Sequence, residues 1–71
     1  MDNFIVLSKE ERIQILTQRL EKTEEAAKQN YDYAEAAAIC GNPAEETYYR
    51  NKYYVLYDEI QKIRQTISNE E

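Results

Sequence analysis

Apolar and small residues recur every three or four positions along two long stretches of this chain. The first stretch covers residues 9–40, where large aliphatic side chains give way to alanines. Its stripe consists of Ile13, Leu16, Leu20, Thr23, Ala27, Asn30, Ala34 and Ala37. The second covers residues 43–68, and its stripe consists of Tyr49, Tyr53, Leu56, Ile60, Ile63 and Ile67. This spacing places the stripe on one side of a helix and predicts two amphipathic helices.

The stretch Cys40-Gly41-Asn42-Pro43 separates the two helices and holds the only glycine and the only proline of the chain. Gly41 suits the position just past a helix end, because glycine takes a positive φ without a steric cost. Asn42 is a good N-cap and Pro43 a good first helical residue. Glu45 is placed like the second half of a capping box. We therefore expect one helix to end and the next to begin almost at once.

Two short segments flank the helices. Ser8 and Glu11 form an S-x-x-E capping box, which predicts that the first helix begins after Ser8. Before it, residues 1–8 form an apolar arm around Phe4 to Leu7. The arm either folds back over the open end of the helix pair or pairs with a partner chain. At the other end, residues 69–71 are expected to form a frayed acidic tail.

Folding the chain at Gly41 brings the two stripes together in one antiparallel register. Tyrosines of the second stripe then face alanines of the first, and isoleucines face leucines. Such volume matching is what a packed helix pair requires. The sequence thus predicts an all-α fold, an antiparallel two-helix hairpin over residues 9–68. Thr23 and Asn30 are polar positions in this seam, where they could set the register or the oligomeric state.

The hairpin is too small to enclose a core, because each of its two helices leaves one flank in water. Chains of about this length usually need cross-links or oligomerisation, and the single cysteine, Cys40, offers no disulfide framework. Of the seven tyrosines, only Tyr49 and Tyr53 are needed for the seam. We expect the remaining rings, with Val55, to help two hairpins associate as a homodimer in a four-helix bundle.

Composition narrows the function classes. The net charge of −5 argues against phosphate binding and against anionic membranes, but permits basic protein partners. The chain has no histidine, and Cys40 lies at a helix C-terminus, where the helix dipole opposes a thiolate. We therefore expect no catalysis, no metal and no cofactor. A lone cysteine and the lack of a long apolar run predict a cytoplasmic protein.

Tyrosines and acids gather around the turn, where they form the candidate contact surface for a second copy or a partner protein. Tyrosine is common in binding hot spots, because its ring buries much area for little rotamer entropy. The candidate residues are Tyr31, Asp32, Tyr33, Glu35, Glu45, Glu46, Tyr48, Tyr54 and Tyr57. In one form of this hypothesis the acids imitate DNA phosphates and bind a basic DNA-binding protein.

A very short, acidic, tyrosine-rich chain without cofactor motifs is typical of small phage or mobile-element proteins that bind and block a host protein. The functional hypothesis is therefore an inhibitor or adaptor. One alternative is a purely structural unit of a homo-oligomeric bundle. Another is a small regulator that binds a nucleotide-like ligand between subunits, although the sequence places no basic group beside the rings to take a phosphate.

In length and architecture the hairpin resembles the small two-helix sporulation phosphatases that act on response regulators. Their Ser-Gln-Glu-Leu-Asp signature is missing, since the comparable stretch reads Tyr54-Val55-Leu56-Tyr57-Asp58-Glu59. The resemblance implies the hairpin architecture and carries no activity over.

Overall fold

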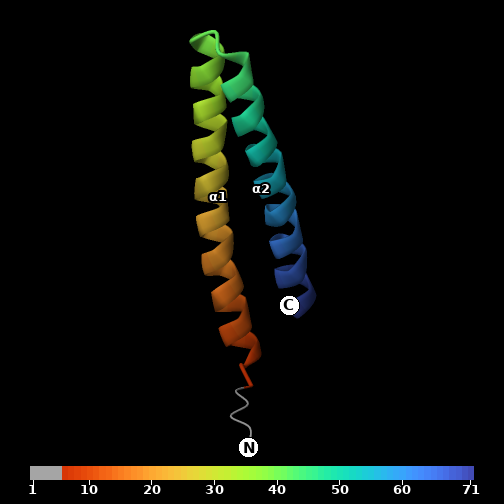
Figure 1. Cartoon of the computed structure of the whole chain (residues 1–71). Coiled ribbons are helices and arrows are strands. Elements are labelled where there is room, and N and C mark those ends of the chain that lie inside the picture. Colours follow the sequence, from red (N-terminus) through yellow and green to blue (C-terminus); the bar gives the residue numbers. More distant parts are fainter. Residues whose placement is uncertain (1–5) are drawn as a thin grey trace, which may run out of the picture.

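The computed structural model describes residues 6–71, which form two helices packed side by side as an antiparallel hairpin (Figure 1). Helix α1 spans Lys9–Ile39 and helix α2 spans Pro43–Glu70. No strand occurs in residues 6–71. The predicted all-α hairpin is confirmed. Over the same residues, neither helix has a stretch long and apolar enough to cross a membrane.

The expected capping box begins α1. Ser8 Oγ accepts a hydrogen bond from the backbone N–H of Glu11 at 3.1 Å, and Glu11 Oε1 accepts one from the backbone N–H of Ser8 at 2.8 Å. Most of the predicted apolar arm, residues 1–8, lies outside the described residues. Within the described part, the carbonyl of Leu7 accepts a hydrogen bond from Arg12 Nη1 at 2.8 Å.

The turn closes α1 with a pair of hydrogen bonds typical of a Schellman motif. The N–H of Asn42 donates to the carbonyl of Ala37 at 2.9 Å, and the N–H of Gly41 donates to that of Ala38 at 3.1 Å. Gly41 has a φ of 72°. Asn42 Oδ1 then caps α2 by accepting from the N–H of Glu45 at 3.2 Å. Because the Asn42 N–H is already used by Ala37, Glu45 does not complete the expected capping box.

Helix α2 continues two residues beyond the expected end at 68. Asn69 Oδ1 accepts a hydrogen bond from Gln65, and Glu70 Oε1 accepts two from Arg12 of α1, at 3.0 and 3.1 Å. The bond from Gln65 lies within α2, and the two from Arg12 hold the last turn against α1. Asn69 and Glu70 therefore belong to the helix and not to a frayed tail.

The seam between the helices follows the two predicted stripes, and every residue of both is buried or half-buried. The pairs Arg12 with Glu70 and Glu35 with Arg50 agree with the predicted register. Full burial is confined to few and mostly small side chains. They are Thr23, Ala27, Ala34, Ala37, Ile60 and Ile63. The core is thus a single thin seam, and both of its flanks remain in contact with solvent.

Candidate functional site

The hairpin has two broad faces, one on each side of the plane that contains both helices. Contacts between the helices show which residues belong to each face. On one, Glu24 pairs with Arg64 and Tyr31 contacts Tyr53. We call it the Tyr31 face, and it comprises Glu24, Lys28, Tyr31, Glu35, Glu46, Arg50, Tyr53, Tyr54, Tyr57, Gln61 and Arg64. On the other, Arg19 pairs with Glu59 and, near the open end, Arg12 pairs with Glu70. We call it the Val55 face, and it comprises Arg12, Ile15, Arg19, Ala26, Tyr33, Tyr48, Lys52, Val55, Glu59 and Glu70.

Four tyrosines form one cluster on the Tyr31 face, with Tyr53 at its centre. The Tyr53 ring lies 5.6 Å from that of Tyr31, 5.7 Å from Tyr54 and 6.2 Å from Tyr57, between ring centroids. Two of these contacts are edge-to-face, the arrangement that aromatic quadrupoles favour. The rings therefore brace one another while Tyr31, Tyr54 and Tyr57 stay about half exposed.

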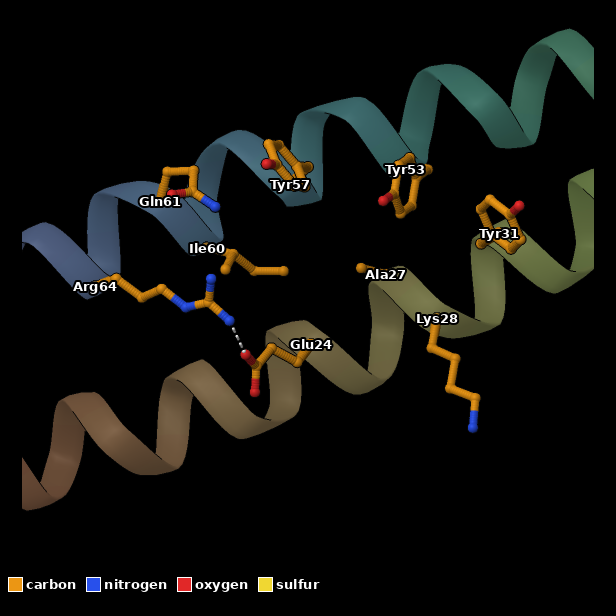
Figure 2. A pocket seen from close by; sticks show the side chains of 9 residues that line it. All are labelled: Glu24, Ala27, Lys28, Tyr31, Tyr53, Tyr57, Ile60, Gln61 and Arg64. Atoms are coloured by element: carbon orange, nitrogen blue, oxygen red, sulfur yellow. Dashed lines mark hydrogen bonds and ion pairs between the residues drawn. The ribbon is translucent and has the colours of Figure 1, made fainter.

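A groove of about 430 Å³ runs beside this cluster (Figure 2). Rings from both helices line one half of it, and Ala27 and Ile60 lie on the seam beneath. At the other end, Arg64 Nη2 lies 2.7 Å from Glu24 Oε2. Figure 2 shows the Lys28 ammonium pointing away from the rings. The groove thus combines an aromatic wall with one cation that is already held by a carboxylate.

The acids of the Tyr31 face are engaged by a cation. Arg50 donates to Glu46 Oε2 at 2.8 Å and to Glu35 Oε2 at 3.2 Å. These bonds, first that to Glu46 and then that to Glu35, hold the pKa of Arg50 above its usual value, because they favour the charged guanidinium. Two of the four predicted acids therefore share a single cation, which offsets about half of their charge.

The remaining tyrosines form a second cluster on the Val55 face. Tyr49 lies 5.2 Å from Tyr33 and 5.1 Å from Tyr48, between ring centroids. Lys52 Nζ sits 5.0 Å from the centre of the Tyr48 ring, a cation–π contact. Further along, Val55 is 68% exposed. This face has its own groove of about 430 Å³, lined by Asn30, Tyr48, Asn51, Lys52, Val55 and Leu56.

The structure distributes the predicted contact residues over different surfaces. The Tyr31 face holds Tyr31, Glu35, Glu46, Tyr54 and Tyr57. Tyr33 and Tyr48 lie on the Val55 face, and Glu45 lines a hollow near the turn with Tyr33 and Tyr49. Asp32 is exposed and belongs to neither face. Any one partner surface therefore contains only part of the predicted set.

Sequence reasoning missed the charged end of the Tyr31 groove. The i, i+4 spacing of Glu24 and Lys28 favours a pair within α1, yet Glu24 binds Arg64 of α2. The expectation of no fixed cation beside the rings was also wrong, because Arg64 lines the same groove as Tyr57. The signal was the helical spacing of Tyr57, Gln61 and Arg64, which places all three on one side of α2.

Residues 6–71 offer few groups for metal binding or thiol chemistry. Nowhere in that range do three Asp, Glu, Cys or His side chains gather closely enough to hold a metal ion. Cys40 is a free, exposed thiol beside the turn. No protein-family model matches this chain, and no curated protein or solved structure matches it either. The two faces are therefore the basis on which a function can be argued.

Proposed function

We propose that this chain is a non-catalytic protein–protein interaction module, a small inhibitor or adaptor of the phage or mobile-element type. In this proposal it acts in the cytoplasm as a homodimer and blocks a host protein. One observation carries the proposal: the braced, half-exposed tyrosines of the Tyr31 face beside an open groove. Tyr31 is 46% exposed and Tyr57 50%.

Such a cluster suits partner binding for an energetic reason. Each ring loses little freedom on binding, because contacts with Tyr53 already restrict it. An apolar side chain of the partner would fill the groove over Ala27 and Ile60, with Gln61 and Arg64 at its rim. Aromatic anchors around a pocket that excludes water are the usual form of a binding hot spot.

The ion pairs of Arg50 bear on the kind of partner. A DNA mimic needs free carboxylates, whereas Glu35 and Glu46 are both bonded to Arg50. Paired acids make a poor copy of a phosphate backbone. The proposal therefore rests on the rings, and a basic DNA-binding partner has less support than a partner that presents an apolar side chain.

Capture with matched variants tests the proposal. Wild-type chain, the Tyr31→Ala/Tyr57→Ala double variant and Ile39→Ala serve as immobilised baits for a cell lysate. Ile39 is the control because it is apolar, 85% exposed and outside both faces. We expect a protein that binds wild type and Ile39→Ala but binds the double variant at least about thirtyfold more weakly, as loss of hot-spot residues implies. Equal binding by all three baits would contradict the proposal.

The thin core favours a second candidate, a purely structural bundle unit in which every ring is buried by self-association. Iodide quenching of tyrosine fluorescence separates the two. A variant with Tyr33, Tyr48 and Tyr49 changed to Phe reports only on Tyr31, Tyr53, Tyr54 and Tyr57. Free quenching of these rings in the assembled protein supports a partner face. Full protection of the same rings supports the structural unit.

Arg64 gives the nucleotide alternative one supporting observation, since it lines the ring-bearing groove. A base could stack on Tyr31 or Tyr57, but a phosphate would have to compete with Glu24 for the guanidinium. Added nucleotide should then raise the melting temperature in a concentration-dependent way. No shift at millimolar nucleotide would remove this alternative.

A further inference from the structure

We infer that the Val55 face is the surface on which a second copy of this chain packs, so that the Tyr31 face stays open for a partner. The inference rests on the homodimer of the proposed function and names its interface. It follows from the shape of the hairpin, from the distribution of exposed apolar side chains and from the placement of charges on the two faces.

The shape of the hairpin calls for a second layer. Its extents are 56 × 28 × 14 Å, so it is a slab about one helix thick. Most of the buried side chains are small, and no large side chain among the described residues is less than 2% exposed. A stable interface buries about 800 Å² on each partner. A broad face of this slab is large enough to supply that area.

Exposed apolar side chains run along the whole Val55 face. Ile15 is 51% exposed near the open end, Val55 68% near the middle, and Tyr33 and Tyr48 52% and 55% toward the turn. Ile15 and Tyr33 are separated by about 27 Å along α1 at the usual helical rise. On the Tyr31 face the exposed rings are confined to the half nearer the turn. A second hairpin laid along the first therefore finds apolar contacts over a longer distance on the Val55 face.

The charges of the Tyr31 face oppose its burial. Two cross-helix ion pairs span it, Glu24 with Arg64 at 2.7 Å and Glu35 with Arg50 at 3.2 Å. Taking such pairs out of water costs more than their attraction returns unless new hydrogen bonds replace the solvent. The pairs of the Val55 face, Arg12 with Glu70 and Arg19 with Glu59, lie in the half of the hairpin away from the turn. On the Tyr31 face, by contrast, the pair of Glu35 with Arg50 lies among the residues near the turn, where the exposed rings are.

The charges of the Val55 face suit a second copy of itself. Among the residues that the structure describes, two cross-helix ion pairs lie on this side, Arg19 with Glu59 at 3.8 Å and, at the open end, Arg12 with Glu70 at 3.0 Å. Lys52 and Glu59 lie on the same stripe of α2, two turns apart, and carry opposite charges. A two-fold interface presents the same surface twice. A face that holds both signs is therefore able to pair with itself.

The test compares one lysine substitution on each face by light scattering over a range of chain concentrations. Val55→Lys should weaken the dimer at least about thirtyfold, because it places a charge at the centre of the interface. Tyr57→Lys, on the Tyr31 face, should leave the dimer as tight as in wild type. Circular dichroism checks the helix content of each variant. If Val55→Lys fails to fold, Val55→Thr replaces it in the test, because it keeps the shape of the side chain, and it should weaken the dimer by about tenfold.

Any of three results would overturn the inference. They are a wild-type chain that is monomeric at about 100 μM, a Val55→Lys variant that dimerises like wild type, and a Tyr57→Lys variant whose dimer is weakened as much as that of Val55→Lys. Partner binding through Tyr31 and Tyr57 is measured separately. A monomer that still binds a partner through those rings would contradict only the assignment of the Val55 face as a dimer interface. A dimer of the expected kind that binds no partner would contradict the proposed function but not this assignment.

Discussion

The guanidinium of Arg50 reaches across the hairpin to Glu35 of α1, with Nη2 3.2 Å from Oε2. Its Nε donates at the same time to Glu46, one turn earlier on α2, at 2.8 Å. One cation thus joins the two helices near the turn and takes up two acids. What the sequence presents as an acidic cluster is in part a cross-helix clamp.

A double-mutant cycle of Arg50→Met and Glu35→Gln should give a coupling energy of about 0.2–1 kcal/mol, the range of partly exposed ion pairs. Raising the salt concentration to 1 M should reduce it, because mobile ions screen exposed charges. Urea denaturation at a fixed chain concentration measures both. The pair of Asp58 and Lys62 is the control, since both side chains are about 70% exposed or more and stay within one helix. A coupling that salt does not change would contradict the prediction.

Gly41→Ala should lower the free energy of unfolding by about 1–2 kcal/mol, the cost of left-handed backbone for a residue with a Cβ. Gly41 has a φ of 72°, and an added Cβ would meet nothing within 4 Å, so backbone strain is the whole effect. Gly41→Asn should lose less, because asparagine tolerates this conformation better. Thermal denaturation ranks the three proteins. Equal stability of the alanine variant would mean that the turn has rearranged.

The hairpin could be predicted because two independent signals agree. The apolar stripes specify two helices, and Gly41 with Asn42 specifies where the chain reverses. The end of α2 could not be predicted in the same way. Glu70 is held by Arg12, 58 positions earlier in the chain, and no local signal reports that contact.

The composition of the candidate site was predicted more completely than its arrangement. Helix geometry alone separates Tyr31 from Tyr33, because residues two apart point in different directions. The pairing of Glu24 with Arg64 depends on the distance and angle between the helices, which the sequence does not report. A choice between a local partner such as Lys28 and a cross-helix partner therefore needs the packed structure.

Thr23→Val should change the free energy of unfolding by less than about 1 kcal/mol, because a gain and a loss of similar size oppose each other. Thr23 is buried, and its Oγ1 donates to the carbonyl of Arg19 in its own helix at 2.8 Å. That carbonyl keeps its helical hydrogen bond when the hydroxyl is removed. The added methyl group gains about 0.8 kcal/mol of burial, against about 0.5–1.5 kcal/mol for the lost bond. Urea denaturation of wild type and Thr23→Val at equal chain concentration measures this difference in the free energy of unfolding. A loss above 1 kcal/mol would show that the hydroxyl has a further partner in the assembled protein.

Ala34→Leu should destabilise the hairpin by about 1–3 kcal/mol, the usual cost of overpacking. Ala34 is 0% exposed, so the larger side chain must force α1 and α2 apart near the turn. The matched control is Ala38→Leu, one turn later on the exposed side of α1, which should stay within about 0.5 kcal/mol of wild type. If both substitutions have the same effect, the small side chains of α1 do not set the distance between the helices.

Acid should weaken the start of α1 through Glu11. The pKa of Glu11 is lowered from its ordinary value of 4.5, first by the hydrogen bond from the Ser8 backbone N–H and then by that from its side chain. A lowered pKa in the folded state means that the charged form stabilises folding. This contribution is complete above pH 4.5 and is lost as the pH falls through the lowered value. Wild type should therefore be more stable than Glu11→Gln at pH 7, and the difference should vanish in strong acid. Ser8→Ala should retain most of the pH dependence, because it keeps the backbone donor. Thermal midpoints between pH 7 and pH 2 measure the effect, and a constant difference between wild type and Glu11→Gln across that range would refute it.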